Sequence, residues 1–399
     1  SKYIQGEISQ TLINSYTTLI NSHSKKRFKS QRFDPMKPHV HFLLALTLVE
    51  NLGPKGLADL LKIHGSPKTA FESIPRGMRR ALFLRAEEIN QQVTTLGARV
   101  VSCHCKEYPF NLRNICDAPG VIYVKGTIPQ EIDKAIAVVG TRKCSEEGKR
   151  FAEMAVDQMA KNGFPLVSGM ALGIDTAAHK AAVFYGLKSV AVFAHGLDQI
   201  HPKSNVRLAH EILDKGGAWI SEHPPGTNVL KWMFAARNRI LVGLCVGTVL
   251  AESPESGGSM ISLKLALDYG RATYAFQPPN AYMKRWDGNR RVIAENKGFA
   301  IKTMPQWMRK LHHEVPAMKR TTHEMNDVKK AAKANMDASL ELIPDPCKSV
   351  YKEVSVNTIS AFELSKKLKT NIKTIRTRLF ILETLQRVER LPGDCYSRL

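Results

Sequence analysis

Residues 135–277 repeat one pattern: a short apolar run, a polar turn that contains glycine, and then an amphipathic stretch with helical period. The apolar runs are 135–140, 165–169, 189–194, 218–222, 248–252 and 273–277. Helices are predicted over 145–162, 174–186 and 205–215, and around 234–245 and 259–270. Strands that are apolar on both faces and alternate with helices indicate an α/β fold with a doubly wound, mostly parallel sheet. Ligands of such sheets bind at the carboxyl ends of the strands.

The pattern changes outside this region and predicts four further segments. Residues 1–36 contain the basic run 24–32 without a sustained period, which is typical of a flexible basic arm. Residues 37–98 contain two apolar-faced helices, a helical hairpin (SAM/HhH-like) domain that either points backbone amides at a DNA phosphate or serves packing alone. The sheet domain takes 99–306, and a polar, lysine-rich linker takes 307–343. Residues 344–399 contain a helix at 360–368, a turn, a helix at 372–384 and a hairpin, which predict a winged helix.

The charge of the chain indicates a polyanionic partner. Lysine and arginine number 58 against 36 acidic residues in 399, a formal net charge of +22. A surplus of that size favours nucleic acid. We expect no membrane anchor, because no run of about 18 apolar residues is present. The amino-terminal segment also lacks an apolar signal core, so we expect a cytoplasmic protein.

The cysteines do not predict a disulfide framework or a metal site. Seven cysteines at irregular spacing in a chain of this length suit a reducing compartment. Residues 103–105, Cys-His-Cys, have the residue types of zinc ligands, but no second pair follows to complete four ligands. We therefore expect no metal.

The turns after the first two strands of the repeat predict an anion site. The first contains Gly140, Thr141 and Arg142, and the second runs from Ser168 through Gly169 and Gly173 to Asp175. A helix begins directly after each turn, so free amides and the positive ends of the helix dipoles face one edge. Neither turn is a Walker A loop, since seven residues separate Gly140 from Gly148, and neither has the GxGxxG spacing. We therefore expect phosphate binding without a nucleotide cofactor.

Two later turns add cations and aromatic rings. Lys203, Asn205 and Arg207 follow the third strand, and Arg237, Asn238 and Arg239 lie near Trp232 and Phe234. Single-stranded nucleic acid requires cations that follow the backbone and rings that stack on bases. Alternatively, the two rings belong to the core and Arg239 pairs with Glu222 or Glu252.

Five ordered segments resemble one family. They are VVGTRKCSEEGKRFAE (138–153), PLVSGMALGIDTAAHKAA (165–182), GLDQIHPKSNVRLAHEI (196–212), SEHPPGTNVLKWMFAARNRI (221–240) and ESGGSMISLKLALDYGRATYAF (255–276). Together they resemble the DNA-processing protein A (DprA, also called Smf) family. His201 departs from this pattern, because family members commonly have tyrosine at that position.

The resemblance implies an extended Rossmann-like fold, homodimers, and binding of single-stranded DNA with no cofactor. It also implies loading of RecA recombinase onto incoming strands in natural transformation and DNA recombination. By the same resemblance, Arg142 contacts phosphate, Ser168 and Gly169 contact DNA, and Asp175 orders its loop.

Two other functions compete with this interpretation. Phosphoribohydrolases share the sheet, but they carry a Pro-Gly-Gly-x-Gly-Thr loop that this chain lacks, and no nucleophile and base are paired. We therefore expect no enzyme activity. The second alternative is a regulator that binds duplex DNA through the winged helix, where Lys373, Arg376 and Arg378 lie on the second helix. A protein partner for that domain is the other interpretation.

Overall fold

The computed structural model describes residues 38–278, 283–315, 344–354, 359–385, 388–391 and 394–398. The arm expected at 1–36 lies outside the described residues, as does most of the expected linker. The chain divides into two compact units, residues 1–315 and 316–399.

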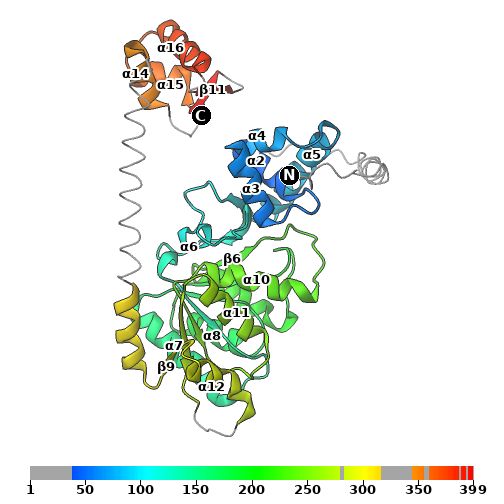
Figure 1. Cartoon of the computed structure of the whole chain (residues 1–399), viewed down its shortest axis with the longest axis vertical. Coiled ribbons are helices and arrows are strands. Elements are labelled where there is room, and N and C mark those ends of the chain that lie inside the picture. Colours follow the sequence, from blue (N-terminus) through cyan, green and yellow to red (C-terminus); the bar gives the residue numbers. More distant parts are fainter. Residues whose placement is uncertain are drawn as a thin grey trace. The chain divides into compact units, whose positions relative to one another are not determined.

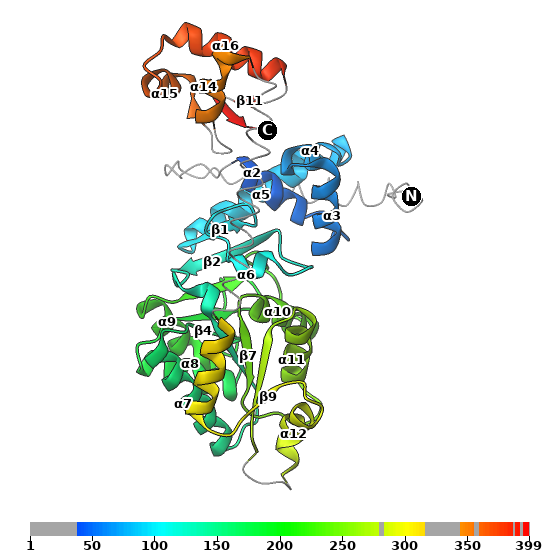
Figure 2. The same cartoon turned by 60° about the vertical axis from the view of Figure 1, so that its left-hand side comes forward.

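A nine-stranded sheet forms the centre of the first unit (Figures 1 and 2). Its order is β1-β2-β6-β5-β4-β3-β7-β8-β9. The strands are β1 (Ala98–Ser102), β2 (Val121–Gly126), β3 (Ile136–Val139), β4 (Leu166–Ser168), β5 (Ser189–Val192), β6 (Ala218–Ser221), β7 (Gly247–Leu250), β8 (Ala272–Phe276) and β9 (Phe299–Ile301). β1 pairs with β2 and β2 with β6 in antiparallel fashion, and the other neighbouring pairs are parallel. The α/β fold with a mostly parallel sheet is thus confirmed.

Helices cover both faces of the sheet. They are α6 (Phe110–Arg113), α7 (Glu146–Asn162), α8 (Ile174–Phe184), α9 (Val206–Asp214), α10 (Lys231–Gly243), α11 (Gly258–Asp268) and α12 (Asp287–Ala294), with short 3₁₀ turns at Ile132–Lys134, Lys203–Asn205 and Lys284–Trp286. α10 and α11 pack together on one face, and α7, α8 and α9 lie on the other (Figure 2). The strands are therefore buried on both sides, as their apolar sequences require.

The direction of strand addition reverses once in this sheet. From β3 the chain adds β4, β5 and β6 on one side, then returns to place β7, β8 and β9 on the other side of β3. The carboxyl ends of β3 and β7 therefore form the switch point, where the connections diverge and leave a crevice.

Four helices precede the sheet: α2 (Pro38–Thr47), α3 (Pro54–His64), α4 (Pro67–Glu72) and α5 (Arg76–Thr95). The two helices expected around residues 52–56 are α2 and α3. Pro54 starts α3 where its missing N–H costs nothing, and Gly65 ends it with φ +74°. Leu43, Leu44 and Leu46 of α2 are completely buried, so these helices share a core with the sheet.

The start of the linker expected from residue 307 overlaps a helix. Residues 304–315 form a helix, because Trp307, Leu311 and Val315 are apolar at helical spacing and are buried. The polar residues that follow in the sequence made this short apolar pattern difficult to recognise as a helix.

The second unit contains α14 (Asp345–Glu353), α15 (Ala361–Lys367) and α16 (Ile372–Thr384) with a small antiparallel sheet of order β10-β12-β11. Its strands are β10 (Ile359–Ser360), β11 (Val388–Leu391) and β12 (Cys395–Arg398). Ser360 and Glu363 form a reciprocal capping box at the start of α15. Val350, Leu364, Ile375 and Leu379 are completely buried, which gives this unit its own core.

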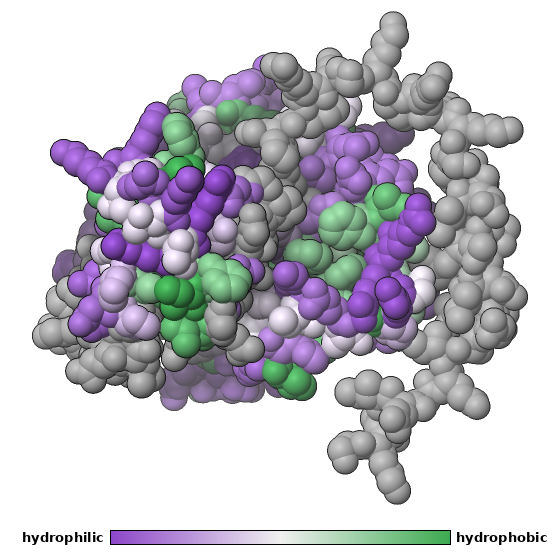
Figure 3. Space-filling view, turned by 90° about the horizontal axis from the view of Figure 1, so that it is seen from above, coloured by the Kyte–Doolittle hydropathy of each residue, from purple (hydrophilic) through white to green (hydrophobic). Residues whose placement is uncertain are grey.

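No described helix is long and apolar enough to cross a membrane. On the face shown in Figure 3, hydrophilic side chains separate the apolar ones into small patches.

Candidate nucleic-acid interface

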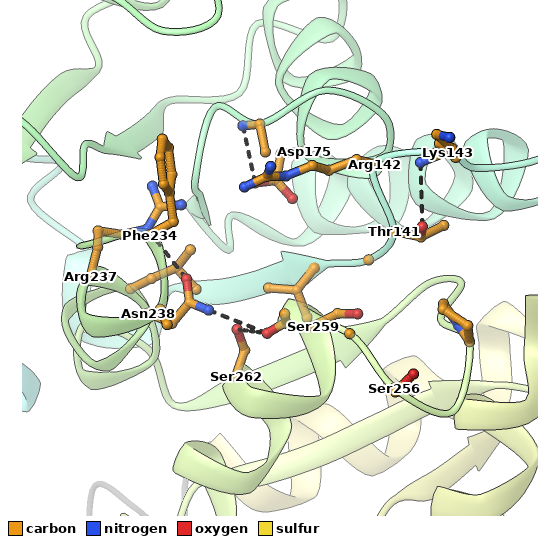
Figure 4. Close-up of a pocket in the computed structure, with 18 of the residues that line it drawn as sticks. Thr141, Arg142, Lys143, Asp175, Phe234, Arg237, Asn238, Ser256, Ser259 and Ser262 are labelled. Atoms are coloured by element: carbon orange, nitrogen blue, oxygen red, sulfur yellow. Dashed lines mark hydrogen bonds between the residues drawn. The ribbon is translucent and has the colours of Figure 1, made fainter. Parts of the chain in front are cut away.

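A pocket of about 530 Å³ lies at the switch point, at the carboxyl ends of β3 and β7 (Figure 4). Four segments contribute to its lining: Val139–Lys143 at and after the end of β3, Ala171 and Asp175 of the second turn, six residues between 231 and 241 of α10, and six residues between 254 and 262 before and in α11. Its charged lining residues are four cations and one carboxylate: Arg142, Lys143, Lys231 and Arg237, and Asp175. The pocket therefore favours anions.

Arg142 is the cation that the first turn presents to the pocket. Its side chain is exposed, and its guanidinium carbon lies 5.2 Å from the centre of the Phe234 ring. Figure 4 shows Arg142 reaching from the β3–α7 turn toward α10. The backbone of this turn is less available, because the Thr141 amide donates to the Glu252 carbonyl oxygen at 2.8 Å. The expectation that this amide faces phosphate needs correction, since Glu252 already satisfies it.

The second turn is packed tightly against the first. Gly173 has φ +78°, and a Cβ there would lie 2.3 Å from the Thr141 carbonyl oxygen. The Ile174 amide donates to that same oxygen at 3.3 Å. Only glycine permits both the backbone conformation and this approach. Gly173 thus brings the two predicted turns together.

Ser168 and Gly169 are internal, and their expected contact with DNA stays a prediction. The Ser168 hydroxyl is completely buried and donates to the Val138 carbonyl oxygen at 2.8 Å. The Gly169 carbonyl oxygen accepts from Arg237 at 2.7 Å, and a Cβ at Gly169 would collide with that guanidinium. These residues join β3, β4 and α10.

The starts of α7 and α8 already hold carboxylates of the chain itself. Glu252 is completely buried and accepts from the amide of Ser145 at 2.8 Å and from its hydroxyl at 2.6 Å. Asp175 accepts from the Ala171 amide at 3.2 Å. Burial raises the pKa of Asp175, while Arg237 and the neighbouring amides oppose this change. These two helix dipoles are therefore partly neutralised from within, and the pocket's attraction for anions comes mainly from side chains.

The start of α11 forms the wall that our sequence reasoning missed. Gly257, Gly258 and Ser259 line the pocket there, and the Asn238 side chain holds the Gly258 carbonyl oxygen at 3.3 Å. Lys143 and Lys231 also line the pocket, and no sequence motif pointed to them. A signal for the wall was present, because a glycine pair directly before a helix is typical of anion-binding turns.

Arg237, Asn238 and Arg239, which are expected to bind DNA, are largely buried. Arg237 is 4% exposed and donates to the carbonyl oxygens of Gly169 and Val192. Burial lowers its pKa to about 10, despite the nearby charge of Asp175. Asn238 is 8% exposed.

Arg239 forms a shielded ion pair with Glu222 and donates to the Asp117 carbonyl oxygen at 2.7 Å. The alternative pairing with Glu222 is thus the observed one. Burial raises the pKa of Glu222, and Arg239 opposes that change.

The third turn divides into one structural and two exposed residues. The side-chain amide of Asn205 is buried. It donates to the Met170 carbonyl oxygen at 3.0 Å and to the Thr176 hydroxyl at 2.8 Å, so it supports the second turn. Lys203 is exposed, and Arg207 is exposed while it bonds Glu211 at 2.8 Å. Neither cation lines the pocket.

The two rings of α10 differ in position. Trp232 is 60% exposed, which contradicts the alternative that it belongs to the core. Phe234 is half-buried beneath Arg142 and lines the pocket. Trp232 lies one residue from Lys231, so the first turn of α10 combines a cation and an exposed ring.

The cations expected on the second unit lie on α16. Lys373 and Arg376 are exposed, and Arg378 is half-buried. Arg376 is held by Asp394 at 2.7 Å. Within the described ranges, no three His, Cys, Asp or Glu side chains are grouped as metal ligands.

These features define an α/β protein with a basic pocket at the switch point of a mostly parallel sheet. The family described as DNA recombination-mediator protein A matches residues 99–312, more than half of the chain. The chain therefore belongs to this family, the DprA/Smf family, as the five sequence segments predicted.

Individual relatives match the sheet region. The DNA processing protein DprA of Streptococcus pneumoniae is 42% identical over 168 residues, which are 42% of this chain and 59% of that protein. Protein Smf of Escherichia coli is 38% identical over 172 residues, which are 43% and 46% of the two chains. This chain thus matches about half the length of these relatives. The X-ray structure of DprA from Streptococcus pneumoniae has a TM-score of 0.57 at 30% identity and covers 67% of this chain and 96% of that one.

Proposed function

We propose that this chain binds single-stranded DNA at the carboxyl edge of the sheet. The observation that supports this most is Arg142, an exposed guanidinium fixed over Phe234 at the mouth of a basic pocket. Arg142, Lys143 and Lys231 would hold phosphates, and Lys203 and Arg207 would extend the path beyond the pocket. Trp232 would stack on a base.

The proposed action is binding without turnover. Asp175 is the one carboxylate among the described residues that line the pocket, and it is buried and accepts hydrogen bonds from the amides of Ala171 and Gly169. A general base needs a free lone pair within reach of a substrate proton. This arrangement supports a mediator rather than a hydrolase.

Family membership supports the wider proposal. A homodimer would align two such edges along one strand and raise the local concentration of sites. The strand would then be handed to RecA, which is the loading role in natural transformation and recombination that the family resemblance implies. Sedimentation of the protein alone, and RecA filament growth on a coated strand, test these two steps separately.

We also propose that the second unit is a winged helix and that α2–α5 form a SAM/HhH-like domain. A duplex-binding regulator is the weaker alternative. Three cations of α16 were expected to contact the duplex. Arg376 already forms an ion pair with Asp394 and Arg378 is half-buried, so duplex contact would depend mainly on Lys373.

The central test is the fluorescence anisotropy of a labelled thymine oligomer, single-stranded and duplex, over a salt series. Wild type should prefer the single strand, and Arg142→Ala should reduce the slope by about 0.7 log unit of affinity per log unit of salt. Lys161→Ala is the matched control, because Lys161 lies at the far end of α7 from the pocket. Equal binding to duplex that depends on Lys373 and not on Arg142 would move the function to the second unit.

A further inference from the structure

The pocket at the switch point has the size of a small-ligand site. Its volume of about 530 Å³ falls in the range of about 300–1,000 Å³ that is usual for such sites. Val139, Gly140 and Leu241 line its interior, and the β3–α7 turn, α10 and the start of α11 supply its other lining residues.

One side of the pocket offers groups that suit a phosphate. Within the part of the chain that the structure describes, the backbone amides of Gly258 and Ser259, in the first turn of α11, donate to no acceptor of the protein. Arg142 and Lys231 supply positive charge to the same pocket. A Cβ at Gly258 would meet no atom within 4 Å, so this part of the wall is open.

Another side offers a flat surface that suits a base. The Arg142 guanidinium is held over the Phe234 ring, and guanidinium planes are stacking surfaces for bases. In Figure 4, Phe234 and Arg142 lie across the pocket from Ser259 and Ser262 of α11. A ligand with a phosphate and a base, joined by one sugar, offers a partner to each of these groups.

We propose that this pocket is a one-nucleotide site and that a nucleoside 5′-monophosphate fills it, either free or as the phosphorylated end of a strand. The inference rests on the proposed function, because the nucleotide would use cations that also hold the strand. Free mononucleotide therefore competes with strand binding and regulates it. Lys203 and Arg207, which lie outside the pocket, contact the strand alone.

Calorimetric titration of the full chain with deoxythymidine 5′-monophosphate tests the site directly. Inorganic phosphate and thymidine are the partial ligands. We expect saturable binding that is about tenfold or more weaker in Arg142→Ala, because the guanidinium that stacks on the base and adds positive charge to the pocket is lost. Gly258→Val, whose side chain enters open space at the pocket wall, should weaken the nucleotide similarly. Lys203→Ala should bind the nucleotide like wild type but bind the oligomer less tightly.

Competition in the anisotropy assay identifies the source of the nucleotide. Displacement of a 5′-hydroxyl oligomer by free monophosphate supports a free ligand, and tighter binding of the 5′-phosphorylated oligomer supports a strand end. If the oligomer binds through Arg142 but the monophosphate neither binds nor competes, and a 5′-phosphate adds nothing, the one-nucleotide site is overturned while the proposed function stands. If inorganic phosphate competes as well as the nucleoside monophosphate does, the site binds phosphate alone and its assignment to a nucleotide is overturned. Failure of the oligomer itself to bind overturns the proposed function.

Discussion

The carboxylate of Glu252, at the end of β7, accepts hydrogen bonds from both the amide and the hydroxyl of Ser145, 107 residues earlier, at the start of α7. A Cβ at Gly148 would lie 2.0 Å from the same carboxylate oxygen, so the helix approaches it closely. Glu252 therefore anchors α7.

Glu252→Gln should lower the free energy of unfolding by about 1.5–3 kcal/mol, because the charged acceptor of two buried donors is lost. Urea unfolding measures this change. Glu255→Gln is the matched control, since Glu255 is exposed, and it should change stability by about 0.5 kcal/mol or less. Equal effects of the two substitutions would contradict the anchoring role.

Trp232→Ala should weaken binding of a thymine oligomer by about 1–3 kcal/mol, because one base–aromatic stack is lost. Stability should hardly change, since the ring is 60% exposed. Tryptophan fluorescence measures the contact directly, because Trp219, Trp286 and Trp307 are buried. If the oligomer still quenches the tryptophan fluorescence of Trp232→Phe, the signal comes from a buried tryptophan and the proposed contact with Trp232 is contradicted.

Arg239→Ala should destabilise the protein by about 3–5 kcal/mol, because it leaves Glu222 buried without its partner. Arg239→Met combined with Glu222→Gln should recover much of that loss. Thermal unfolding of the three proteins tests this order. Where the proteins remain folded, oligomer affinity should be close to wild type, and a reduced salt slope in Arg239→Ala would restore Arg239 as a phosphate contact.

Gly173→Ala should destabilise the protein by about 2–4 kcal/mol, the sum of backbone strain and a steric clash. Gly270→Ala separates the two causes. Gly270 also has positive φ, but a Cβ there would meet nothing within 4 Å. We expect a loss of about 1 kcal/mol for Gly270→Ala, measured by urea unfolding. Similar losses of stability in Gly173→Ala and Gly270→Ala would mean that the close contact between the two turns contributes little to stability.

His179 should make the protein less stable in acid. Burial lowers its pKa from 6.5 to about 4, and the charge of Arg237 adds to this effect. The unfolded chain therefore binds the proton more readily, and stability falls as the pH drops from 6.5 toward 4. The loss between pH 7 and pH 5 is about 2 kcal/mol. His179→Gln should remove that share of the pH dependence in urea unfolding, whereas the exposed His313→Gln should leave it unchanged.

The parallel strands could be predicted because each is a short apolar run followed by a helix. β9 and the antiparallel pairing of β2 with β6 could not. β9 has three residues, two of them only half-buried, and so has no clear period. The partner of β2 depends on tertiary contacts, because Tyr123 pairs with Ser221 across almost one hundred residues.

The turns of the site could also be predicted, but not which of their groups remain free. Ser168 and Arg237 have the residue types that bind phosphate. Their hydrogen-bonding groups are taken by the carbonyl oxygens of Val138 and Val192, which a sequence pattern does not place beside them. Trp232 shows the opposite case, because nothing in its local sequence distinguishes an exposed ring from a buried one.

The placement of carboxylates at the starts of α7 and α8 has a consequence for how a strand would move. Backbone amides are fixed in space and would hold each phosphate in one position. Arginine and lysine side chains are long and can follow a phosphate over several ångströms before they exchange it for the next one. Where a phosphate is held by such side chains and not by the amides at the start of α11, a strand would therefore slide stepwise without complete release.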